Sequence, residues 1–250
     1  MNTVQDVDCG TMNEPLVSVV IPTLPERKIV LERAILSVKN QTYKNIEIIT
    51  VTEGRNACEA RNIGISKSKG IFIAFLDDDD TWEPTKIEKQ VTFLKQHCSV
   101  SLVICWIDDC RFSEHYIDKY PECNHKEDIL RLMHFSSTSS YCFRKSHMEK
   151  IGWFDESLPS AQEYDLAIRC AGLVCCIQEP LVTQYKSINQ ITTDSKKKVK
   201  GLQIIYRKHC SDAPLSVKLK FKFAILMYKL QPYLGKTIEK MVIRYKRGGK

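Results

Sequence analysis

Short apolar segments rich in β-branched residues alternate along the chain with segments of helical period, and this alternation is the strongest constraint on the fold. The apolar segments are Leu16–Ile21, Ile46–Val51, Ile71–Leu76 and Val100–Ile107. Apolar side chains recur at helical spacing across residues 29–41, 59–66 and 84–96. Strands joined to helices by short connections form right-handed βαβ units. The sequence therefore predicts an α/β fold with a mainly parallel, Rossmann-like sheet and helices on both of its faces.

The residues that directly follow the predicted strands are the first candidates for a functional site. Ligands bind beyond the carboxyl ends of the strands in open parallel sheets. Pro22 and Thr23 follow the first strand, Glu53 lies just beyond the second, and Asp77–Asp80 follow the third. We therefore expect these residues to face a bound ligand.

Four consecutive aspartates, Asp77–Asp80, end the third predicted strand. Like charges this close repel one another, and a buried strand holds them near a medium of low dielectric constant. A divalent cation removes this repulsion, and oxygen ligands shared with substrate phosphates suit Mg²⁺ or Mn²⁺. The alternative is a solvated acidic turn that caps the next helix, with Asp80 or Thr81 as its N-cap. Because the four aspartates directly follow a strand, the metal site is favoured over the capping turn.

A series of motifs in fixed order resembles the family 2 glycosyltransferases. The motifs are Val17–Thr23, Glu47–Ile49 with its following turn, Ala60–Ile65, Gly70 with Phe75–Trp82, and the downstream pair Gly152–Pro159 and Gln162–Leu166. The resemblance extends from about residue 16 to about residue 210. It implies the GT-A fold, a nucleotide-diphosphate sugar donor, a divalent metal and inversion at the anomeric carbon.

This resemblance assigns roles within the acidic run, which contains the D-x-D motif of the family. Asp77 is expected to lie towards the ribose and the metal, and Asp79 to bind the metal. Asp78 occupies the variable middle position beside the nucleotide, and Asp80 is expected to orient the loop or cap the helix. A metal held there bridges the diphosphate and neutralises the charge that grows on the leaving group.

An inverting transfer also needs a base that removes the proton of the acceptor hydroxyl. Glu163 matches the base position of the family. Asp165 is the second candidate, although on an extended segment its side chain would point elsewhere. The alternative is that both carboxylates are N-terminal charges of a helix over Leu166–Ala171, where they favour the helix dipole.

Other residues of the resemblance concern the donor. Arg61 and Asn62 match an Ala-Arg-Asn segment that lies beside the nucleotide. Arg61 could pair with a donor phosphate or with the acidic run, or equally form a salt bridge that fixes its helix. Glu53 stands where the family usually has an aspartate that contacts the nucleobase, and its extra methylene leaves the identity of the base open.

The polar run Ser136–Ser140 is predicted to be a flexible loop.

Charge divides the chain into an acidic front and a basic tail. From residue 191 onward there are 16 Lys and Arg against Asp194, Asp212 and Glu239, a net charge of +13, so the first 190 residues carry −6 of the total +7. Apolar residues such as Phe221, Phe223 and Leu226 are interleaved with the lysines. This pattern is typical of a helix lying on an anionic membrane, with the three named side chains in the bilayer. The alternative is that the tail packs on the catalytic domain; no nucleic-acid motif accompanies the charge.

These patterns predict a loose arm over 1–14, a GT-A domain over 15–210 and a basic amphipathic tail over 211–250, without which the chain is expected to stay folded. No export signal precedes the domain, and 11 cysteines cannot all pair, so we expect reduced thiols and a cytoplasmic, peripherally membrane-bound protein.

The predicted function is a metal-dependent inverting transfer of a sugar from a nucleotide-diphosphate donor to a hydroxyl of a glycan or lipid-linked acceptor. The competing class is a non-catalytic module of the same fold that binds nucleotide sugars or glycans. A nucleotidyltransferase is disfavoured, because no basic Gly-rich loop follows Ile21.

Overall fold

The computed structural model describes residues 14–111, 116–124, 126–132, 135–170, 174–186 and 194–246, so the predicted arm over 1–14 lies outside the described residues apart from Glu14. The first half of the chain contains β1 (Val17–Pro22), α1 (Lys28–Lys39), β2 (Ile46–Val51), α2 (Ala57–Lys67), β3 (Phe72–Phe75), β4 (Asp80–Trp82), α3 (Lys86–Gln96), β5 (Leu102–Asp109), β6 (Tyr116–Asp118) and β7 (Cys123–Asn124). The second half contains α4 (Lys126–Leu132), the 3-10 helix η1 (Thr138–Ser140), β8 (Cys142–Arg144), α5 (Lys145–Ile151), α6 (Gln162–Arg169), β9 (Val174–Gln184), α7 (Ser195–His209) and α8 (Leu215–Lys246).

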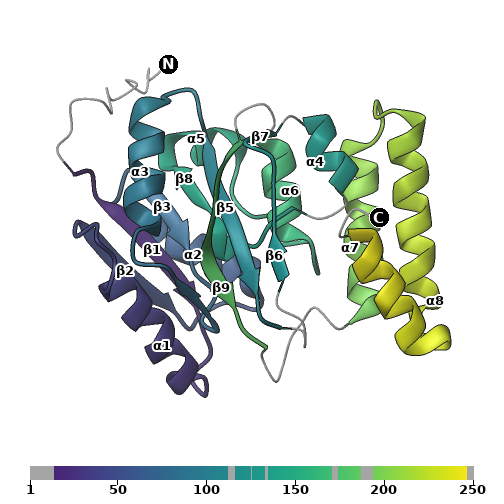
Figure 1. Cartoon of the computed structure of the whole chain (residues 1–250), viewed down its shortest axis with the longest axis horizontal. Coiled ribbons are helices and arrows are strands. Elements are labelled where there is room, and N and C mark those ends of the chain that lie inside the picture. Colours follow the sequence, from purple (N-terminus) through teal and green to yellow (C-terminus); the bar gives the residue numbers. More distant parts are fainter. Residues whose placement is uncertain are drawn as a thin grey trace.

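A single sheet of nine strands in the described residues forms the centre of the molecule (Figure 1), in the order β2-β1-β3-β8-β5-β9-β4 with β6 beside β5 and β7 beside β9. The long strands β2, β1, β3, β5 and β9 run in one direction. The short strands β4, β6, β7 and β8 run against them. The predicted α/β fold with a mainly parallel sheet is therefore confirmed.

Helices cover both faces of this sheet, as predicted. Side chains of β1 alternate between the faces, because successive residues of a strand point to opposite sides. Val17, Val19 and Ile21 pack with α1 and α3 on one face. Val20 packs on the other face, whose core also receives side chains of α2 and of α4 to α8.

The segment after the third strand differs from the alternative sequence interpretation. Asp80–Trp82 forms β4, which pairs with Val182–Gln184 of β9. The next helix, α3, begins at Lys86 and has Thr85 as its N-cap. Asp80 and Thr81 therefore cap no helix, because this short strand carries the acidic run across to a distant part of the chain.

The basic tail folds back on the domain. Helices α7 and α8 stand together at the end of the molecule opposite α1 and β2 (Figure 1). Phe221 is fully buried, and its ring lies 6.3 Å from that of Tyr164 in α6 and 6.0 Å from that of Tyr206 in α7. The expectation that Phe221 enters a membrane is wrong, because this side chain belongs to the protein core. Within the described residues, no helix has the length and apolarity to cross a bilayer.

Replacing Phe221 with Ala is expected to lower the free energy of unfolding by about 3 kcal/mol, since a buried aromatic ring is replaced by a cavity. The matched control is Phe223→Ala two residues on, whose side chain is 49% exposed and whose loss is expected to cost about 0.5 kcal/mol. Urea denaturation of the two variants measures the difference. A chain ending at Ser211 is accordingly expected to unfold, contrary to the sequence-based expectation, and equal losses for the two variants would show that α8 does not pack as described.

Candidate active site

The four aspartates alternate between open and buried positions. The side chains of Asp77 and Asp79 are 30% and 23% exposed, whereas that of Asp78 is 8% exposed and Asp80 is buried. The two open carboxylates are the first and third of the run. They are thus the pair that the resemblance assigns to the D-x-D motif, and their role as metal ligands stays a prediction.

Asp78 is held by residues that follow β1. Thr23 Oγ1 donates a hydrogen bond of 2.7 Å to Asp78 Oδ2, and Arg27 donates from Nε and Nη2 to the two carboxylate oxygens at 2.8 Å each. Arg27 Nη2 also lies 3.0 Å from Asp79 Oδ2. Arg27 therefore supplies part of the counter-charge that the sequence analysis attributed to a metal.

Arg27 was missed by the sequence analysis. The only signal was its place in the turn between β1 and α1, directly before the first residue of that helix. The prediction that Thr23 and Asp78 contact the donor stays a prediction. In the structure their polar atoms bind one another and buttress the acidic loop.

Asp80 lies in a buried polar cluster built on η1. Ser139 Oγ donates to Asp80 Oδ2 at 2.6 Å, and Gln184 Nε2 donates to the same oxygen at 3.1 Å. Burial, followed by the charge of Asp77, raises the pKa of Asp80 to about 8. Ser136, Thr138, Ser139 and Ser140 are all buried, so the predicted flexible loop over 136–140 is wrong. The hydroxyl groups of this run support the acidic strand end.

The structure predicts an unusual pH dependence of stability from Asp80. Because its pKa is higher in the folded protein than in the unfolded chain, the folded state holds more protons between about pH 4 and 8, and stability from this group falls as the pH rises. Asp80→Asn is expected to flatten that decline, and to raise stability at pH 8 more than at pH 5. Thermal unfolding of metal-free protein across this range measures the effect. An unchanged slope would contradict the burial of an ionisable carboxyl group at this position.

Arg61 connects the acidic run to the rest of the site. Its guanidinium is buried, and Nη2 donates to Asp77 Oδ1 at 2.5 Å and to Thr138 Oγ1 at 3.0 Å. Nε of Arg61 is buried without an acceptor among the described residues. Of the partners considered from the sequence, the acidic run is therefore the one observed, and an unsatisfied donor remains.

Glu163 stands in the first turn of α6. Ala161, the residue directly before α6, has a φ angle of 61°, a left-handed conformation that is costly for a residue with a Cβ. The backbone oxygen of Glu163 accepts a hydrogen bond of 3.1 Å from Tyr141. Its carboxylate has no hydrogen bond or ion pair with any residue that the structure describes, and its charge acts on Arg61.

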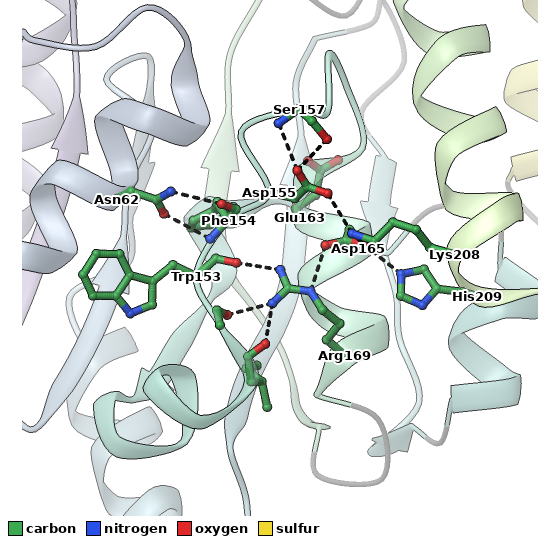
Figure 2. Close-up of polar contacts among 12 residues, drawn as sticks. Asn62, Trp153, Phe154, Asp155, Ser157, Glu163, Asp165, Arg169, Lys208 and His209 are labelled. Carbon is green, nitrogen blue, oxygen red and sulfur yellow. Dashed lines mark hydrogen bonds and ion pairs between the residues drawn. The ribbon is translucent and has the colours of Figure 1, made fainter.

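Asp165 is completely buried, and it lies in the helix α6 rather than on an extended segment. Figure 2 shows its carboxylate among three basic side chains: Arg169 Nε, Lys208 Nζ and His209 Nε2, each at 2.8 Å. Burial alone opposes ionisation, but hydrogen bonds from His209 and Lys208 and the charge of Arg169 hold the pKa of Asp165 well below its ordinary range. Such a carboxylate is a poor proton acceptor, so the geometry favours Glu163 over Asp165 as the base.

The same network holds the loop between α5 and α6 (Figure 2). Arg169 donates to the backbone oxygens of Ile151, Gly152 and Trp153 at 2.7 to 2.9 Å. Lys208 reaches from α7 to Asp155 at 2.7 Å. The last turn of α7 thus fixes the loop that resembles the acceptor-side motif.

The side chain of Asn62 pairs with this loop from the opposite side. Its Nδ2 donates to Phe154 O and its Oδ1 accepts from Phe154 N, both at 3.0 Å. Glu53 is 60% exposed beyond β2 and binds Lys67 at 3.2 Å. Pro22 is the last residue of β1 and lies opposite Val51 of β2. Contacts of these three residues with a donor remain predictions.

A divalent metal fits the open carboxylates. The described residues contain no group of three or more His, Cys, Asp or Glu side chains able to enclose an ion. Mg²⁺ or Mn²⁺ at a phosphate site takes only one or two carboxylates and completes its coordination with phosphate oxygens and water. Asp77 and Asp79, which are both partly exposed, satisfy that requirement.

Comparison with known sequences gives consistent matches. The family model described as glycosyl transferase family 2 matches residues 49–152. An uncharacterised glycosyltransferase of Methanocaldococcus jannaschii is 27% identical over 64% of this chain and 66% of its own length. One from Rickettsia prowazekii is 30% identical over 61% of this chain and 57% of its own. Escherichia coli WcaA, provisionally named a colanic acid biosynthesis glycosyl transferase, is 27% identical over 79% of this chain and 82% of its own.

Solved structures share the fold. Staphylococcus aureus TarS 1-349 in complex with UDP-GlcNAc has a TM-score of 0.64 and 14% identity, covering 89% of this chain and 74% of that one. The mannosyltransferase PcManGT of Pyrobaculum calidifontis, in complex with GDP-Man and Mn²⁺, has a TM-score of 0.55 and 16% identity, covering 96% and 77%. At these identities the likeness establishes the shared architecture.

Proposed function

We propose that this chain, which belongs to glycosyltransferase family 2 and has the GT-A fold, moves a sugar from a nucleotide-diphosphate donor to a hydroxyl group of a glycan or lipid-linked acceptor, with inversion at the anomeric carbon. Membership of the family supports glycosyl transfer in general. The arrangement of charged side chains in the site supports the inverting reaction.

One observation carries the proposal. The buried guanidinium of Arg61 donates a hydrogen bond to Asp77, at one end of the acidic run. The negative charge of Glu163, in the first turn of α6, raises the pKa of the same guanidinium. One carboxylate of the acidic run therefore binds this buried cation, and the charge of a separate carboxylate on α6 acts on the same cation. An inverting transfer needs this division between a group that holds the leaving diphosphate and a group that accepts a proton.

Asp77 and Asp79 are the residues proposed to hold Mg²⁺ or Mn²⁺ together with the donor diphosphate. The metal, when bound, neutralises charge that develops on the leaving group. A diphosphate approaching Asp79 would also bring phosphate oxygens near the guanidinium of Arg27, which then has a partner beyond Asp78 and Asp79. The unsatisfied Nε of Arg61 offers a further donor for a phosphate oxygen.

Glu163 is the proposed base. Its carboxylate accepts the proton of the acceptor hydroxyl while the hydroxyl oxygen forms a bond to the anomeric carbon. The bond between that carbon and the diphosphate oxygen breaks, and the nucleoside diphosphate leaves with the electron pair. A carboxylate without partners among the described residues is available for this step, whereas the ion-paired Asp165 is not.

The alternative function is a binding module of the same fold that transfers no sugar. It is disfavoured because, among the described residues, no hydrogen bond or ion pair gives the carboxylate of Glu163 a structural role. A module of this kind needs the donor contacts but has no use for a carboxylate beside the acceptor loop.

A donor screen tests the proposal. Purified full chain is incubated with UDP-, GDP- and dTDP-sugars in the presence of Mn²⁺, Mg²⁺ or EDTA, and released nucleoside diphosphate is measured. UDP-GlcNAc and GDP-mannose are included first, because the two similar structures are complexes with these donors. Metal-dependent release from one donor supports the enzyme. Metal-dependent binding without release, even with mixed glycan and lipid-linked acceptors added, would support the binding module.

A further inference from the structure

Helix α8 carries two apolar faces, and the core uses only one of them. The inner face packs on the domain through Val217, Phe221, Ala224 and Tyr228, which are between 0% and 8% exposed. A second set of large apolar residues on the same helix lies at the surface. We call this set the outer stripe, and it consists of Leu215, Leu219, Phe223 and Leu226, which are 71%, 56%, 49% and 51% exposed.

The outer stripe is continuous along the helix. Its members are spaced four, four and three residues apart, which keeps them on one side of a helix with 3.6 residues per turn. Tyr233, seven residues after Leu226 and directly after Pro232, is also exposed, at 84%. Single exposed apolar residues are ordinary, but a row of this length along one helix marks an interaction surface.

Lysines flank the outer stripe. Lys222 and Lys229 are exposed on one side of it and Lys220 on the other, by the same helical geometry. No acidic residue occurs in α8 before Glu239. Within residues 215–233, every charged side chain beside this apolar row is therefore a lysine.

The charges beside the outer stripe indicate which kind of partner binds it. A second copy of the helix would bring lysines against lysines, with no carboxylate among residues 215–238 to offset the repulsion. An anionic lipid surface accepts the apolar row in its acyl region and the lysines at its head groups. We propose that the outer stripe of α8 is a docking surface for an anionic phospholipid bilayer.

The residues that face the bilayer differ from those expected from the sequence, because Phe221 is not among them. The side chain of Phe221 anchors α8 to the domain, so the helix meets the bilayer as a rigid part of the fold rather than as a detached tail. Because α8 packs on α7, whose last turn holds the acceptor-side loop through Lys208, docking orients that loop relative to the membrane.

Vesicle co-sedimentation of the full chain tests the proposal. Binding to vesicles of phosphatidylcholine with 30 mol% phosphatidylglycerol, about one lipid in three, is compared with binding to phosphatidylcholine alone, at low and at physiological salt. We expect salt-sensitive binding to the anionic vesicles only. Leu219→Ser with Leu226→Ser, and separately Lys220→Gln with Lys222→Gln, are each expected to lower the partition coefficient about tenfold or more.

Matched controls come from α1, at the other end of the molecule. Ile29→Ser with Leu36→Ser removes two apolar side chains that are 85% and 57% exposed, and Lys28→Gln with Lys39→Gln removes the same charge. Neither pair should change binding, and circular dichroism should show that all four variants are folded.

Three results would overturn the proposal: no binding of the full chain to anionic vesicles at low salt, equal losses in the α1 controls, or a concentration-dependent dimer in light scattering that Leu219→Ser with Leu226→Ser abolishes. The last result would assign the outer stripe to a second copy of the chain.

Discussion

Replacing Glu163 with Gln is expected to leave the affinity for the nucleotide sugar unchanged and to lower the rate of sugar transfer by about 10²- to 10⁴-fold, the usual contribution of a general base. Gln has the shape of Glu but cannot accept the proton of the acceptor hydroxyl. The fold should be unaffected, because this carboxylate makes no hydrogen bond or ion pair with the residues that the structure describes. Single-turnover transfer rates and donor titration by calorimetry measure the two quantities.

Asp165→Asn is the matched comparison on the same helix. It removes a buried negative charge that is shared by Arg169, Lys208 and His209, so it is expected to lower stability as well as activity. Loss of rate with full stability should therefore distinguish the base from the residue that holds the helix. Wild-type turnover in Glu163→Gln would move the base elsewhere, with Asp165 as the next candidate.

Asp79→Ala is expected to abolish both sugar transfer and the metal dependence of nucleotide binding. Its carboxylate is 23% exposed at the open side of the acidic run, and its removal leaves a metal with at most one carboxylate from the D-x-D pair. The fold should be retained, because Arg27 keeps both of its hydrogen bonds to Asp78. Repulsion within the run also decreases, so the unfolding temperature should stay constant or rise slightly.

Calorimetric titration of UDP and GDP with and without Mn²⁺ measures this effect. The comparison variant is Asp78→Asn, whose side chain is buried against Thr23 and Arg27. That variant should lose stability while nucleotide binding still responds to Mn²⁺. If Asp79→Ala kept a metal response equal to that of the unaltered chain, the assignment of Asp79 as a metal ligand would be wrong.

The class of fold, and the edge of the sheet that carries the acidic run, follow from the amino-acid sequence alone. Strands and helices in the first half follow from local patterns: β2 occupies Ile46–Val51 as predicted, and α1, α2 and α3 begin and end within a few residues of their predicted bounds. Such patterns are readable because a segment buries its apolar face with the period of its own backbone, whichever neighbour it meets. The acidic run could be located in the same way, since it directly follows an apolar strand.

Which polar groups meet, and which apolar face of a helix is covered, depends on contacts between distant segments of the chain. Arg27 reaches Asp78 across 51 positions of sequence, Ser139 reaches Asp80 across 59, and His209 reaches Asp165 across 44. No local pattern encodes such pairs, so a buried serine run was mistaken for a loop, and the three basic partners of Asp165 were not foreseen. In α8, both apolar faces obey the helical period, and the sequence cannot tell them apart. Packing against Tyr164 and Tyr206 buries Phe221 and leaves the outer stripe at the surface, because a helix on the edge of a domain has only one side on which the core can close.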